Sequence, residues 1–106
     1  MSRKYTEEEV RAKFLMNVWS ILDYWKNESR AKTIDEKMEG FAFSFLVMLD
    51  GGNGAMPKFV VAPDPHPDDK AYHESEGVNY FPENHMSDIK CDISGGLHDE
   101  FKKYKK

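Results

Sequence analysis

The chain has 106 residues, which is enough for one domain of ordinary size. Hydrophobic residues make up 40% and charged residues 32%, a mixture too apolar for a disordered chain and too charged for a membrane protein. A single cysteine, Cys91, excludes an internal disulfide framework. We therefore expect one soluble domain over residues 1–106, located in the cytoplasm and without a membrane partner.

Acidic residues are concentrated in one part of the chain, although the formal net charge is only −4. Between Asp64 and Glu100 there are ten acidic and two basic residues, so the remainder carries nine acidic and thirteen basic ones. Carboxylates repel a phosphate backbone, which argues against direct nucleic-acid binding, and they attract a basic protein surface. The residues expected to contact such a partner are Asp64, Asp68, Glu74, Glu76, Asp88 and Asp92. The alternative is a merely solvated surface.

The first predicted element is a helix over residues 7–26. Thr6 followed three residues later by Glu9 has the spacing of a capping box. The apolar residues after it recur at intervals of three and four, as they do on one side of a helix. If this stripe is wider than one core can cover, a homodimer follows.

A second helix is predicted from Thr33 to about Asp50, as the central element of the core. Thr33 is placed to cap it, and Gly40 would allow close contact with the first helix. The large residues of 41–49 also alternate as on a strand, so a strand with a hairpin turn at 50–54 is the alternative. The aromatic residues that we expect to be largely buried are Trp19, Trp25, Phe41, Phe45 and Phe59.

The second half of the chain is predicted to contain short strands and short helices. Residues 57–62 and 87–93 have the composition of strands, and the prolines between them force an extended loop. A short helix is expected from Pro67 until Gly77 stops it, and another from Leu97 onward. The predicted fold class is α+β, with two N-terminal helices packed on a small sheet and short C-terminal helices.

The side chains best suited to bind a metal ion lie among these prolines. His66, Asp69 and His73 offer imidazole and carboxylate ligands, a combination that suits zinc, and Asp69 and His73 would share one side of the helix. The simpler interpretation is that His66 and the neighbouring aspartates cap the helix by accepting its free N–H groups. We favour the cap, with no cofactor, over the zinc site.

The block His66-Pro67-Asp68-Asp69 resembles the first motif of the zinc-dependent N-acetylglucosaminyl deacetylase family. The resemblance implies that His66 and Asp69 bind zinc and that Asp68 acts as general base. The protein would then be a metal-dependent hydrolase with a site at these three residues. Two predicted helices precede the block, however, and the later histidine pair of that family is absent here.

The middle of the chain also resembles a small uncharacterised family of bacterial and phage-type proteins, through residues 39–44, 48–51 and 65–70. This resemblance implies no known activity. The function that we expect is that of an accessory or interaction protein, which uses its acidic surface on a basic protein partner. A phage-type inhibitor is the sharper form of this hypothesis. The alternatives are the hydrolase and a purely structural or regulatory domain.

Overall fold

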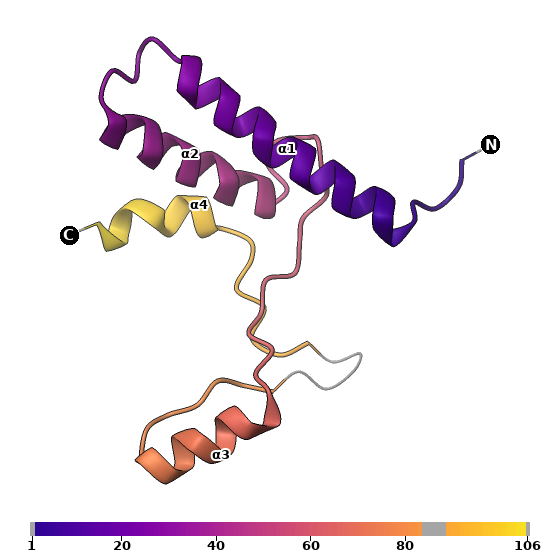
Figure 1. The fold of residues 1–106 in the computed structure, drawn as a ribbon, viewed down its shortest axis with the longest axis vertical. Helices are drawn as coiled ribbons and strands as arrows, with labels where there is room; N and C mark the ends of the chain where they lie inside the picture. The colour runs from indigo at the N-terminus through magenta and orange to yellow at the C-terminus, as the bar shows by residue number, and fades with distance from the viewer. Residues whose placement is uncertain (1, 84–88, 106) are drawn as a thin grey trace. The chain divides into compact units, whose positions relative to one another are not determined.

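The computed structural model describes residues 2–83 and 89–105. Its regular elements, shown in Figure 1, are α1 (Glu7–Asn27), α2 (Ile34–Leu49), α3 (Pro67–Glu76), α4 (Leu97–Glu100) and the 3-10 helix η1 (Phe101–Tyr104). The chain divides into a first unit, Met1–Phe59 with Gly95–Lys106, and a second unit, Val60–Ser94. The sequence predicts that both belong to one domain, and this stays a prediction. No helix in the described ranges is long and apolar enough to cross a bilayer.

The start of α1 is the predicted capping box. The Thr6 hydroxyl accepts the N–H of Glu9 at 3.1 Å, and the Glu9 carboxylate accepts the N–H of Thr6 at 2.9 Å. These bonds satisfy two N–H groups that the first helical turn leaves free. The Arg3 guanidinium also bonds this carboxylate and lowers the pKa of Glu9 to about 2. The predicted helix over residues 7–26 is therefore confirmed.

The second helix is also confirmed, and the strand alternative for residues 41–49 is wrong. The Thr33 hydroxyl accepts the N–H of Glu36 at 3.1 Å, which caps α2 where the sequence predicts. At the other end, the chain turns at Gly51 with φ 79°, a conformation that glycine adopts without a steric penalty. The N–H groups of Gly51 and Gly52 then bond back to carbonyls of the last helical turn.

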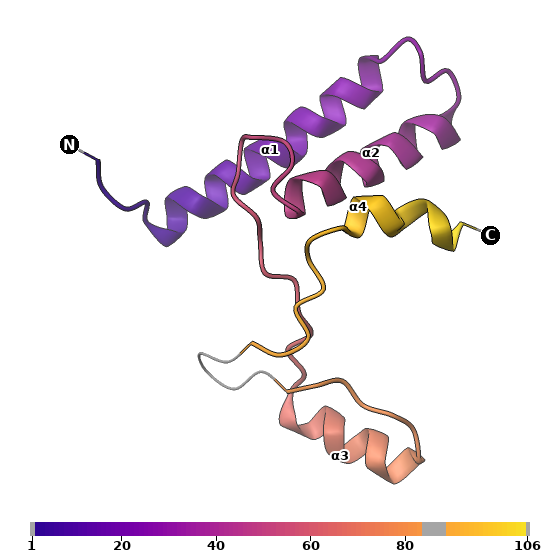
Figure 2. The same cartoon turned by 180° about the vertical axis from the view of Figure 1, so that it is seen from behind.

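Aromatic side chains join α1 to α2. Phe14 of α1 makes edge-to-face contacts with Phe45 of α2, at 6.1 Å between ring centroids, and with Phe59, at 5.4 Å. Phe41 stacks on Phe45 one turn away. The helix α2 lies between α1 and α4 in both views (Figures 1 and 2). As predicted, α2 is the central helix of the first unit.

The buried core is smaller than the sequence predicts. Among the described residues, the buried ones are Ala31, Met48 and Met56. Of the aromatic residues expected to be largely buried, Trp25, Phe41, Phe45 and Phe59 are half-buried. Trp19 is 64% exposed, so its prediction is wrong. The reason is that the apolar residues of α1 occupy more than one side of the helix, and the side that packs on α2 is the one with Phe14 and Trp25.

The predicted α+β class is wrong, because the regular elements in residues 2–83 and 89–105 are all helical. The expected strand at 57–62 and the described part of the expected strand at 87–93 run near each other without forming a ladder. The N–H of Ile93 donates to the carbonyl of Val61 at 2.7 Å, but the N–H of Val61 donates to the Asp92 carboxylate. Cys91 has φ 61°, a left-handed conformation that interrupts an extended segment.

The two short helices of the second half are confirmed. Pro67 is the first residue of α3, and Gly77, with φ 68°, is its C-terminal cap. Proline suits the first helical position because its N–H is missing where no helical bond is needed. The last helix begins at Leu97 as α4 and continues from Phe101 to Tyr104 as η1.

Candidate functional site

His66 and Asp69 cap α3 reciprocally. The Nδ1 atom of His66 accepts the N–H of Asp68 at 3.1 Å, and the Asp69 carboxylate accepts the N–H of His66 at 3.1 Å. The imidazole thus serves the cap as an acceptor through Nδ1. The favoured interpretation of these residues as a helix cap is therefore confirmed, with His66 in the position that serine or threonine usually takes.

His73, the other proposed metal ligand, lies one helical turn after Asp69. Its side chain is half-buried, and its Nδ1 atom has no hydrogen-bond partner. Across residues 2–83 and 89–105, no group of three or more His, Cys, Asp or Glu side chains is placed to hold a metal ion. His66 and Asp69 are thus brought together by the cap and not as part of such a group. The zinc site at His66, Asp69 and His73 stays a prediction.

The acidic residues expected to bind a partner fall into three sets. Most of them are exposed in the second unit: Asp64, Asp68, Glu74 and Glu76. Asp92 is used inside that unit, because its carboxylate accepts the N–H of Val61 at 2.8 Å and both the N–H and the hydroxyl of Ser94. Asp88 lies outside the described residues.

One side of α3 combines carboxylates with an exposed aromatic ring. Asp68, Tyr72 and Glu76 follow one another at intervals of four residues, so they lie on the same side of the helix. We call these three residues the α3 face. Tyr72 is 62% exposed. The basic residue of α3, Lys70, is engaged elsewhere: its Nζ atom lies 3.6 Å from Glu83 and 5.2 Å from the centroid of the Tyr80 ring.

A polar cluster that the sequence analysis missed joins the end of α2 to the start of α4. The Asp50 carboxylate accepts the N–H of Gly95 at 2.6 Å and that of His98 at 3.0 Å, and it lies 2.6 Å from Nδ1 of His98. Its side chain is 3% exposed. Burial by itself would raise the pKa of Asp50, but the hydrogen bonds from His98 and Gly95 outweigh it and lower that pKa. Asp50 therefore holds the C-terminal segment onto α2 as an ionised group.

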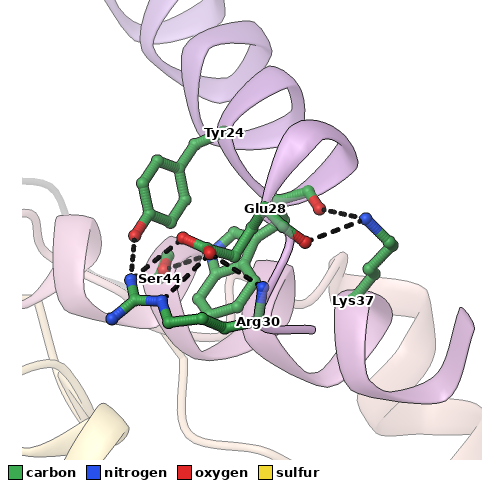
Figure 3. Close-up of polar contacts among 6 residues, drawn as sticks. Tyr24, Glu28, Arg30, Lys37 and Ser44 are labelled. Atoms are coloured by element: carbon green, nitrogen blue, oxygen red, sulfur yellow. Dashed lines mark hydrogen bonds and ion pairs between the residues drawn. The ribbon is translucent and has the colours of Figure 1, made fainter. Parts of the chain in front are cut away.

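A second cluster that the sequence did not predict joins the end of α1 to α2, on either side of the loop between them (Figure 3). The Trp25 indole donates to the Ser44 hydroxyl at 2.8 Å, and its ring covers Gly40 so closely that a Cβ there would lie 2.5 Å from it. Lys37 donates to the carbonyls of Trp25, Lys26 and Glu28 at the C-terminal end of α1. The close contact expected at Gly40 is confirmed.

Glu28 and Arg30 lie beside this cluster. The guanidinium of Arg30 bonds both oxygens of Glu28 at 3.0 Å and also reaches the Tyr24 hydroxyl (Figure 3). These bonds lower the pKa of Glu28 to about 2. Next to them is a hollow of about 580 Å³ with Trp25 and Phe43 among its lining residues. Its lining also includes charged residues: Glu28 and Arg30, which are bonded to each other, and Glu36, Glu39 and Lys102.

No local signal in the sequence points to the Asp50–His98 contact, since the two residues are far apart in the chain. The contact of Trp25 with Gly40 was predictable in part, because a glycine within a helix indicates a close neighbour. Comparison with known proteins adds no assignment: no family model matches the chain, and neither the curated proteins nor the solved structures contain a match.

Proposed function

We propose that this protein is a small interaction protein that binds a basic protein surface through the α3 face. The observation that carries the proposal is the exposed line of Asp68, Tyr72 and Glu76, with the one basic residue of the helix already held against Glu83. Carboxylates at this spacing present negative charge to one side, and the tyrosine ring offers apolar area with a polar end.

The two kinds of side chain contribute differently to binding. Exposed carboxylates add little affinity individually, but they speed the encounter with a basic partner and are sensitive to salt. Tyrosine is among the residues that most often dominate the free energy of binding at an interface. The α3 face therefore has both a steering part and an anchoring part. We place the protein in the cytoplasm, in accord with its single, exposed cysteine.

The contacts of His66 do not support the hydrolase. Its Nδ1 atom and the Asp69 carboxylate are both occupied by backbone N–H groups of the cap. The cap by itself explains why these two side chains lie together, so their geometry gives no separate support to a metal-dependent hydrolase. The same contacts position the first turn of α3 and with it Asp68, so the cap supports the proposed interaction surface.

The experiment compares two charge reversals that differ only in location. Glu76→Lys changes the α3 face at the end of α3, and Glu100→Lys makes the same change at the end of α4. A lysine is favourable at position 76 because it lies at the C-terminus of α3, and position 100 is exposed. Immobilised wild-type protein captures partners from a bacterial extract, and association rates of the purified partner are then measured with each variant.

We expect Glu76→Lys to slow association severalfold and Glu100→Lys to leave it unchanged. Raising the ionic strength beyond about 0.15 M should remove most of that difference, since the Debye length is then below about 8 Å. Tyr72→Ala should act mainly on the dissociation rate. Equal behaviour of both reversals, or binding independent of salt and of Tyr72, would rule out the α3 face.

A further inference from the structure

The side of α1 that does not pack on α2 carries a regular apolar pattern. We call its exposed residues the outer face of α1; they are Ala12, Leu15, Met16, Trp19 and Leu22. Trp19, 64% exposed, and Met16, 68% exposed, are at its centre. An apolar surface of this extent on a helix normally marks a contact site.

The spacing along this face is that of a coiled coil. Ala12, Leu15, Trp19 and Leu22 follow one another at alternating intervals of three and four residues. The same alternation continues to a charged residue at each end, namely Glu8 before Ala12 and Lys26 after Leu22. The face is therefore an apolar seam that is bounded by one negative and one positive charge.

Neither of these charges is used within the described part of the chain. The side chains of Glu8 and Lys26 are exposed, and no ion pair or hydrogen bond engages either of them in residues 2–83 and 89–105. Their neighbours behave differently: Glu7 pairs with Arg11, and Glu9 pairs with Arg3. The two end charges are thus available to a partner.

The seam is complementary to itself when two copies run in opposite directions. The antiparallel register that places Leu15 against Trp19 of the second copy also places Ala12 against Leu22, and Glu8 against Lys26. A two-fold axis repeats each contact, so two opposite-charge pairs close the two ends. In a parallel pair, Glu8 would face Glu8 and Lys26 would face Lys26. Charge therefore selects the antiparallel arrangement.

We propose that a second copy of this chain packs antiparallel on the outer face of α1. Trp19 of each copy then lies against Leu15 of the other, and Glu8 of each copy pairs with Lys26 of the other. The contact uses α1 alone, so it is independent of the proposed role of the α3 face. The homodimer that the width of the stripe suggests thus acquires a defined surface and orientation.

The first test uses sedimentation equilibrium of the full chain. Wild type should be a dimer, and Trp19→Glu should raise the dissociation constant at least a hundredfold. Ile34→Glu is the matched control: it places the same charge at a residue that is 74% exposed on the first turn of α2, where a negative charge is favourable. It should dimerise like wild type. A monomeric wild type would overturn the proposal, as would a dimer insensitive to Trp19→Glu.

The second test swaps the end charges and does not depend on the packing of Trp19. Glu8→Lys and Lys26→Glu should each weaken the dimer, by roughly tenfold at low salt, since two attractions become two repulsions. The double variant, which carries both changes, restores opposite charges at each end and should dimerise like wild type. In a parallel dimer, the single variants would bind no more weakly than wild type, and that result would contradict the antiparallel arrangement.

Discussion

Different interactions stabilise each of the two units internally. In the first unit, aromatic rings of α1 and α2 interlock, and all three buried residues in the described ranges, Ala31, Met48 and Met56, belong to it. In the second unit, none of the described residues is buried. Its described contacts are the caps of α3 and single hydrogen bonds, such as the one from Ile93 to Val61 between the extended segments. Side-chain packing therefore stabilises the first unit, and local hydrogen bonds to backbone groups stabilise the second.

The difference has a functional consequence. A segment with few buried contacts opens locally at a lower free energy than the whole chain unfolds. Its residues are correspondingly less constrained by packing, so α3 can carry the exposed Asp68, Tyr72 and Glu76 without disturbing a core. The first unit supplies the stability, and in our proposal the second supplies the contact surface.

The largest effect is expected where α1 meets α2. Trp25→Ala removes the indole that covers Gly40 and bonds Ser44, and we expect a loss of about 3 kcal/mol in the free energy of unfolding. This figure is at the lower end of the range for aromatic residues because Trp25 is only half-buried. Chemical denaturation measures the loss. A loss under about 1 kcal/mol would show that side-chain packing is not what stabilises the first unit.

Gly40→Ala tests the same contact from the other side. Alanine is the better helix former by about 1 kcal/mol, but its Cβ would lie 2.5 Å from the Trp25 ring. We expect the clash to prevail, with a net loss of about 1–2 kcal/mol. In the Trp25→Ala background the clash is absent, so the same substitution should stabilise by about 1 kcal/mol. Stabilisation in both backgrounds would argue against the close contact.

Asp50→Asn is expected to have an intermediate effect. The amide can accept from only one side, so the N–H of Gly95 or that of His98 loses its acceptor, at a cost of about 2 kcal/mol. Asp99→Asn is the control, because its exposed carboxylate lies at 3.5 Å from the other nitrogen of the same His98 ring. It should change stability by less than about 0.5 kcal/mol.

The pH dependence of the free energy of unfolding provides a second test of Asp50. Its pKa is lowered in the folded protein, so its ionised form contributes stability above the ordinary carboxyl pKa of about 4. That contribution is lost as the pH falls through the lower, folded pKa. The difference in stability between wild type and Asp50→Asn should therefore shrink on acidification from pH 6 to pH 3. A difference that grows in this range would contradict the assignment.

The smallest effect is expected in the second unit. His66→Ala removes the acceptor for the N–H of Asp68, and helix caps contribute about 1 kcal/mol. The loss should be confined to the amide protection of α3 and should be the same with and without a chelator. Glu74→Ala, an exposed position on the same helix, is the control. A rise in melting temperature with one equivalent of zinc that His66→Ala abolishes would instead support a metal site.

How well each feature was predicted depends on how local its cause is. The start of α1 and both ends of α3 were predictable because Thr6 with Glu9, Pro67 and Gly77 act on their own neighbours in sequence. The absence of the expected strands could not be predicted, because strand pairing depends on a distant partner. The segments at Val61 and Ile93 meet without forming a ladder. The left-handed conformation of Cys91 could not be foreseen, since non-glycine residues seldom adopt it.

The candidate site shows the same division. The cap by His66 follows from its position before Pro67 and was predicted, whereas the contact of Asp50 with His98 depends on the tertiary fold. Trp19 was assigned to the core because periodicity identifies apolar sides of a helix without indicating what covers each one. Its exposure is instead the basis of the proposed antiparallel pairing.

Amide hydrogen exchange at the level of single residues tests the difference between the two units most directly. We expect the amides in the middle of α2, such as that of Phe45, to exchange only on global unfolding. The amides of α3, such as that of His73, should exchange through local opening at a free energy at least about 2 kcal/mol lower. Trp25→Ala should then accelerate exchange in α2 and leave exchange in α3 unchanged. Equal protection of the two helices, with both accelerated together by Trp25→Ala, would contradict the account.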